Sequence, residues 1–215
     1  MKKRKIKEDK HESQLKWVLA ILGIIIAIMA AIFLVEMGSS KFEYLGVKFE
    51  KIQQGSRIEY NALFPLADAS GKVTAYMPFT FSEDPRKLRN IKINGTIKLK
   101  KNVAFSATKE VIMEKCDDSI LAPSRLNSFL VSAGLNLKEY TVVVNETEAV
   151  ERNLTYSDCG NLDEKYSVIL FEKGSNDKII KDENCYRLQI ANCNFMNVTE
   201  RFMMGVYASN RGIDI

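Results

Sequence analysis

The pattern of charged and apolar positions changes abruptly near the start of the chain. Residues 1–16 carry seven basic and three acidic side chains, and residues 17–35 carry no charge. A helix over residues 17–35 would rise about 28 Å, close to the hydrocarbon thickness of a bilayer. Because lysine and arginine resist translocation, the pattern predicts a basic cytoplasmic tail over 1–16, a transmembrane helix over 17–35 and an extracytoplasmic remainder.

Other segments also begin with a basic stretch and an apolar run. A cleaved signal peptide has a shorter core, about 7–15 residues, and a small-residue cleavage site that residues 34–38 do not offer. A buried helix of a soluble protein is rarely apolar on every side with lysines at one end. A pilin-like leader needs a Gly or Ala processing site, which is absent from residues 10–13. We therefore expect an uncleaved single-pass anchor, with a linker over 36–41.

Short alternating segments follow the linker. Residues 42–115 read as a β-rich, membrane-proximal region, because aromatic and branched residues recur at strand spacing between Gly- and Pro-containing breaks. The predicted strands cover residues 42–52, 58–66, 74–82, 91–100 and 103–115. This arrangement is typical of an antiparallel sheet or a sandwich.

Residues 116–215 read as an α/β distal region. Pro123 opens a helical pattern that Gly134 ends. Further strands are predicted over 140–144, 166–171 and 186–190, with residues 173–176 joining the last two, and a short helix is predicted near Asn197 with Glu200 as a capping pair. The predicted fold class is α+β, in which residues 42–115 and 116–215 form either two regions or one domain.

The positive charge belongs to the tail. The chain has a formal net charge of +4, and residues 17–215 balance to zero. Nucleic-acid binding is therefore not predicted, since it needs a basic face on the folded domain. The expected partners are the lipid bilayer, which the tail touches through anionic headgroups, and a protein or envelope polymer outside the membrane. The tail also reads as a topology signal alone.

Four cysteines lie in the predicted extracytoplasmic part, at Cys116, Cys159, Cys185 and Cys193. An even count there predicts two disulfides. Their spacings of 43, 26 and 8 positions lack the close pairs of a zinc site, and free thiols remain an alternative. A strand between Cys185 and Cys193 would hold them too far apart to bond, so each is expected to pair with Cys116 or Cys159.

Four N-x-T sequons support the same topology, although Asn and Thr are also common in turns. The candidate glycosylation sites are Asn94, Asn145, Asn153 and Asn197.

Several kinds of catalytic site are excluded by composition. The only histidine is His11, in the tail, so no His-dependent nucleophilic or metal site can form in the rest of the chain. No phosphate-binding or dinucleotide-binding glycine motif occurs, and neither a cofactor nor a metal is predicted. Glycoside hydrolysis needs only two carboxylates, and the adjacent acids at 83–84, 117–118 and 163–164 are candidates that also fit solvated turns.

A charged stretch over residues 84–89 is the most distinctive exposed segment. Its Arg86, Lys87 and Arg89 are candidates to contact a carboxylate, phosphate or sugar acid of a ligand or partner. The alternative is a turn in which these residues pair with the neighbouring acids.

Short motifs carry a family resemblance. They are Asp84-Pro85-Arg86, Cys185-Tyr186-Arg187-Leu188, Asn192-Cys193 and Thr199-Glu200-Arg201-Phe202. In these the chain resembles uncharacterised membrane-anchored surface proteins of small-genome archaea. The resemblance implies a cell-envelope location and no particular activity.

Together these features predict a single-pass, non-catalytic binding or assembly protein of the cell envelope, with its N-terminus in the cytoplasm. The alternatives are an anchored carbohydrate-active enzyme that uses paired carboxylates, and a minor pilin-like component.

Overall fold

The protein is described by a computed structural model that covers residues 16–31, 40–67, 72–137, 147, 150, 159 and 165–213. The chain divides into two compact units, residues 1–42 and 43–215. The predicted strand over 140–144 lies outside the described residues.

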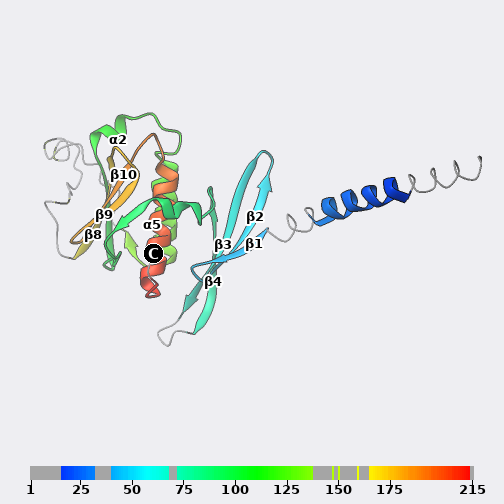
Figure 1. The fold of residues 1–215 in the computed structure, drawn as a ribbon. Helices are drawn as coiled ribbons and strands as arrows, with labels where there is room; N and C mark the ends of the chain where they lie inside the picture. Colours follow the sequence, from blue (N-terminus) through cyan, green and yellow to red (C-terminus); the bar gives the residue numbers. More distant parts are fainter. Residues whose placement is uncertain are drawn as a thin grey trace, which may run out of the picture. The chain divides into compact units, whose positions relative to one another are not determined.

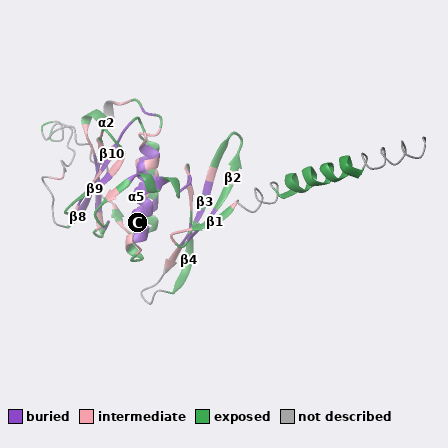
Figure 2. Cartoon of the chain, viewed as in Figure 1, coloured by how far each residue is buried: buried purple, intermediate pink, exposed green. Residues whose placement is uncertain are grey.

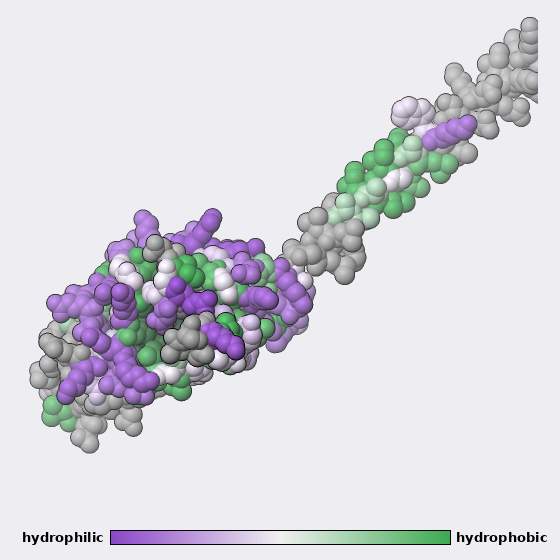
Figure 3. All heavy atoms as spheres, turned by 90° about the horizontal axis from the view of Figure 1, so that it is seen from below, coloured by the Kyte–Doolittle hydropathy of each residue, from purple (hydrophilic) through white to green (hydrophobic). Residues whose placement is uncertain are grey.

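The N-terminal unit corrects the predicted fold class. Residues 16–31 form a helix whose side chains are exposed and mostly hydrophobic, drawn in green in Figure 3. Within the described part of the chain, no helix combines the length and the apolar character that crossing a membrane requires. The prediction of a transmembrane helix over 17–35 is therefore wrong, while the α+β class of the remaining chain holds.

A four-stranded sheet opens the larger unit (Figure 1). Its strands, in spatial order, are β1 (Lys41–Tyr44), β2 (Val47–Gln54), β3 (Arg57–Ala67) and β4 (Val73–Phe81). Strands β2, β3 and β4 are antiparallel, as predicted. The single strand predicted over 42–52 is two strands, because Leu45 and Gly46 both have positive φ and turn the chain back on itself.

The second sheet is mixed and has the order β5-β9-β10-β8-β6-β7. Its strands are β5 (Lys92–Asn94), β6 (Asn102–Ala107), β7 (Asn136–Leu137), β8 (Tyr166–Lys173), β9 (Lys178–Asp182) and β10 (Cys185–Ile190). Strands β8 and β10 are parallel neighbours, and β9 pairs antiparallel with β10. The predicted direct connection between β8 and β10 is wrong, because β9 lies between them in sequence.

The prediction of one long strand over 91–100 is also wrong, because side chains of the second sheet bond to part of this backbone. Only β5 joins the sheet, and beyond it the backbone bonds to side chains instead of a neighbouring strand. The Tyr186 hydroxyl accepts a bond from the Lys98 amide at 3.0 Å and donates to the Lys98 carbonyl at 2.8 Å. The Lys100 amide donates to Ser167 Oγ at 2.9 Å. These bonds satisfy the backbone without a ladder.

The helical segments follow β4 and the strands of the second sheet. They are the 3-10 helix η1 (Lys87–Asn90) and the helices α2 (Lys109–Met113), α3 (Leu121–Ser132) and α5 (Phe195–Asn210). The predicted strand over 103–115 is therefore β6 followed by α2.

Helices α3 and α5 differ in how well their ends were predicted. Gly134 ends α3 as predicted: it has φ of +82°, and Leu135 N bonds to Leu130 O in the capping pattern that favours glycine. The capping pair at Asn197 and Glu200 is wrong, because α5 begins at Phe195 after Asn194.

A single core joins the two sheets. Helix α5 packs against α3 and β10, and Figure 2 shows it buried along most of its length. The Phe64 ring of β3 makes edge contacts with Phe129 of α3 and Tyr207 of α5, while Tyr186 of β10 meets Phe202 of α5. Strand β3 and helices α3 and α5 are thereby held in fixed positions around the site described next.

Candidate functional site

A cleft of about 380 Å³ lies between strands β3 and β4 and helix α3. This volume falls in the range of about 300–1,000 Å³ that is typical of small-molecule sites. Its lining residues are Asn61, Pro78, Phe79, Thr80, Ser124, Arg125 and Ser128.

The strand side of the cleft carries an amide and a hydroxyl beside two apolar side chains. Asn61 and Thr80 are cross-strand partners, and the Thr80 hydroxyl donates to Asn61 Oδ1 at 2.9 Å. This bond leaves the Asn61 amide nitrogen as a donor. Pro78 lies on β4, an edge strand, which is where proline is tolerated within a sheet.

The helix side carries one cation and two hydroxyls. These three groups share one side of α3, because Ser128 lies four positions after Ser124 and three positions after Arg125. The Ser128 hydroxyl bonds back to the Ser124 carbonyl at 3.1 Å. The cleft therefore combines polar groups from two elements that are far apart in sequence.

Arg125 is held from behind by a buried carboxylate. Its Nη1 lies 3.2 Å from Glu200 Oε1 and 2.9 Å from Ser82 Oγ, and it also contacts Met196 Sδ at 3.7 Å. The Arg125 side chain is 25% exposed, whereas that of Glu200 is fully buried. Among the described residues, Nε and Nη2 of Arg125 have no hydrogen-bond partner. The guanidinium is thus fixed on one side and open on the other.

Glu200 is surrounded by donors. Besides Arg125, the backbone amides of Ser82 and Glu83 donate to its two oxygens at 2.7 and 3.3 Å. Burial raises the pKa of Glu200 to about 7, against the lowering effect of these hydrogen bonds and of Arg125. Near neutral pH the charged and neutral forms of this carboxyl group are therefore both populated.

No protein-family model, curated protein or solved structure matches this chain. The resemblance to archaeal surface proteins therefore stays a prediction, and function has to be argued from the residues themselves.

The predicted contact residues Arg86, Lys87 and Arg89 do not line the cleft. Arg86 binds Asp84 through Nε at 2.9 Å and through Nη2 at 2.6 Å, and Lys87 Nζ lies 3.2 Å from Glu83 Oε1. The bond from Arg86 is the largest cause that lowers the pKa of Asp84. Arg86 and Lys87 thus pair with acids of the same turn, and a role of Arg86, Lys87 and Arg89 in partner contact stays a prediction.

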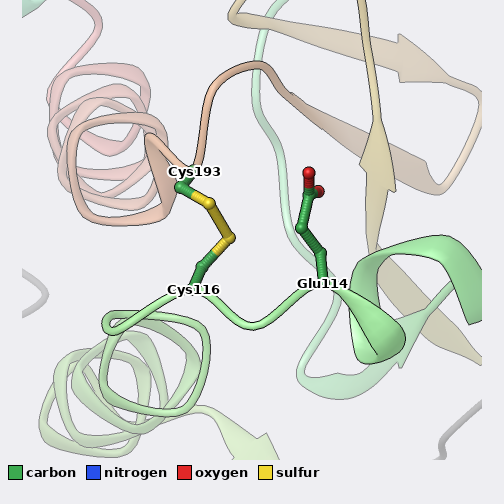
Figure 4. Close-up of side chains that lie close together, drawn as sticks. All are labelled: Glu114, Cys116 and Cys193. Atoms are coloured by element: carbon green, nitrogen blue, oxygen red, sulfur yellow. A yellow bond between two sulfur atoms is a disulfide. The ribbon is translucent and has the colours of Figure 1, made fainter.

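All four cysteines form disulfides, as the even count predicted. Cys116 bonds to Cys193 and Cys159 bonds to Cys185, so the disfavoured Cys185–Cys193 pair is not formed. Figure 4 shows Glu114 beside the first pair, with its ligand atom within 4.8 Å of both sulfurs. Because the sulfurs are bonded to each other, neither is a thiolate that binds a metal, and Glu114 pairs with Lys173 at 2.9 Å.

The sequons have different surroundings. Asn94 is exposed at the end of β5, whereas Asn197 lies inside α5, where Thr199 is buried. Asn145 and Asn153 lie outside the described residues, as does the acid pair at 163–164. The pair at 117–118 lies in the turn before α3 and is not among the residues that line the cleft.

Arg125 and Glu200 were not predicted from the sequence as members of a functional site, and Glu200 was assigned only a capping role. A signal for Glu200 was present, because the charged residues Glu200 and Arg201 lie in the mostly apolar stretch 195–208, and charged residues are rarely buried without partners. What the pattern lacked was any indication that Arg125, 75 positions earlier, would be the partner of Glu200.

Proposed function

We propose that this chain is a non-catalytic binding protein that works in an extracytoplasmic compartment and holds a small polar ligand in the cleft beside α3. The disulfides support the compartment, because such bonds persist mainly in oxidising surroundings.

The observation that carries the binding role is the open side of Arg125. A cation held rigidly by Glu200 and Ser82 loses little freedom when a ligand binds it, and the hydroxyl and amide groups around it orient a polar molecule. Phe79 and Pro78 add apolar surface to the same cleft.

Catalysis by paired carboxylates has less support. The lining residues, which all belong to the described part of the chain, include no carboxylate. Glu200 is bonded to the lining residue Arg125, but its oxygens are occupied by Arg125 and by the Ser82 and Glu83 amides. A glycoside hydrolase needs two facing carboxyl groups about 5–10 Å apart.

The test is a ligand screen on the full-length oxidised protein. Thermal shift and calorimetry against a panel of sugars, sugar acids, amino acids and inorganic anions should find a ligand whose binding is lost in Ser128→Trp. Ser128 is exposed on α3, so tryptophan there fills the cleft without disturbing the core. Ser132→Trp, also exposed on α3 but absent from the cleft lining, is the matched control. If no ligand in the panel responds to Ser128→Trp, the cleft is not a binding site.

A further inference from the structure

The open side of Arg125 has a definite shape. Nε and Nη2 form the planar fork that binds both oxygens of a carboxylate in parallel, and Nη1 is the nitrogen committed to Glu200 and Ser82. The fork therefore favours a planar anion with two oxygens over a lone acceptor.

The charge at the site limits the ligand further. Glu200 neutralises Arg125 when it is ionised, so the pair carries one positive charge at most, when Glu200 is protonated. A single anion suits such a site better than a phosphate dianion does. An amino acid would also bring an ammonium group, for which the described lining residues offer no negative partner.

The rest of the lining suits a hydroxylated molecule. The side chains of Asn61, Thr80, Ser124 and Ser128 each combine donor and acceptor capacity, as pairing with sugar hydroxyls requires. Phe79 and Pro78 offer apolar surface to the C–H face of a ring.

On these grounds, and resting on the binding function proposed above, we propose that the cleft binds a uronic acid, with its carboxylate on the Nε–Nη2 fork of Arg125. The ligand is either a free sugar acid or the end of an acidic glycan.

Binding is coupled to Glu200. A carboxylate on Arg125 places a second negative charge near Glu200, which favours the protonated form of Glu200. The other groups facing Glu200 are the Ser82 and Glu83 amides, and Lys87 pairs with the Glu83 side chain. The neighbouring Arg201 donates its Nε to Ile91 O. Affinity should therefore fall as the pH rises through about 7.

The experiment is calorimetry on the full-length oxidised protein with glucuronate and galacturonate. Glucose is the neutral control, inorganic phosphate the competing anion, and a short oligogalacturonate the polymer arm. Uronate should bind, and Arg125→Lys, which keeps the charge but loses the fork, should weaken it about ten- to a hundred-fold. Arg57→Lys, on an exposed residue at the start of β3, should leave the affinity unchanged. Glu200→Gln should remove the pH dependence.

The outcomes separate the two proposals. Binding of the oligomer alone, sensitive to Arg125→Lys, supports the uronic-acid proposal and assigns the glycan as the source. Equal binding of phosphate or glucose, or uronate affinity unchanged in Arg125→Lys, overturns it. If another ligand from the panel binds in a manner sensitive to Ser128→Trp while no uronate binds, the uronic-acid proposal fails and the binding function stands. Unfolding curves for each variant verify that the fold is kept.

Discussion

At the scale of single residues, Glu200 is the most unusual group in the larger unit. A carboxylate taken fully out of water is costly unless several donors surround it, and Ser82, Glu83 and Arg125 supply them. The raised pKa shows that these donors do not fully offset the loss of water.

This pKa shift makes folding stability depend on pH. The carboxyl group has a folded pKa of about 7 against 4.5 when unperturbed, so between these values the folded state binds the extra proton. Stability from this group is present below about pH 4.5 and falls as the pH rises to 7, by roughly 3 kcal/mol. Urea unfolding of Glu200→Gln at pH 5 and pH 8 should show a smaller drop than the wild type. Glu50→Gln, on an exposed position of β2, is the control, and an unchanged drop in Glu200→Gln would contradict the assignment.

At the scale of elements, the sequence predicted those whose signal is local. The glycine stop of α3 was found because the helical pattern that starts at Pro123 and the Gly134 that ends it are properties of neighbouring residues. The capping pair at Asn197 and Glu200 failed because the same residues also satisfy a different arrangement, in which Glu200 meets the β4–η1 turn far away in sequence.

The strand predicted over 91–100 also failed because of contacts with residues far away in the sequence, and only Lys92–Asn94 forms a strand. Alternating Ile91, Ile93 and Ile97 do face the interior in part, but the decision between strand and irregular chain is made by Tyr186 and Ser167. A tertiary side-chain contact of this sort leaves no trace in the local pattern. For the same reason, Arg125 could not be recognised as a site residue from α3 alone.

Tyr186 tests this explanation. Tyr186→Phe removes both hydrogen bonds to Lys98, so the Lys98 amide and carbonyl lose these partners. This variant should therefore have a free energy of unfolding about 1–3 kcal/mol lower than that of the wild type. Hydrogen exchange should show faster exchange of the Lys98 amide. Tyr76→Phe, at an exposed position of β4, should change neither quantity. Equal exchange at Lys98 in both variants would show that the hydroxyl does not hold this segment.

At the scale of the whole molecule, the two disulfides join segments that lie far apart in the sequence. Cys116–Cys193 ties the segment before α3 to the segment before α5, and Cys159–Cys185 ties Cys159 to the second sheet, where it packs against Ala104, Val168 and Leu170. Their sequence separations are 77 and 26.

The longer loop should matter more. Closing it restricts the unfolded chain by about 1 kcal/mol more than closing the shorter one, out of about 3–5 kcal/mol for each bond. Thermal and urea unfolding should therefore show a larger loss for Cys116→Ser with Cys193→Ser than for Cys159→Ser with Cys185→Ser. In reducing buffer the wild type and both double variants should converge. Variants that differ as much after reduction as before it would assign the losses to serine packing and not to the bonds.

The Cys116–Cys193 link also affects the alignment of the two helices at the candidate site. The bond connects the segment just before α3, the helix that carries Arg125, to the segment just before α5, the helix that carries Glu200 (Figure 4). Protein with free thiols lacks this covalent bond, so only the packing of the helices aligns Arg125 with Glu200. Oxidation of these two cysteines therefore adds a covalent constraint on the two helices that hold Arg125 beside Glu200.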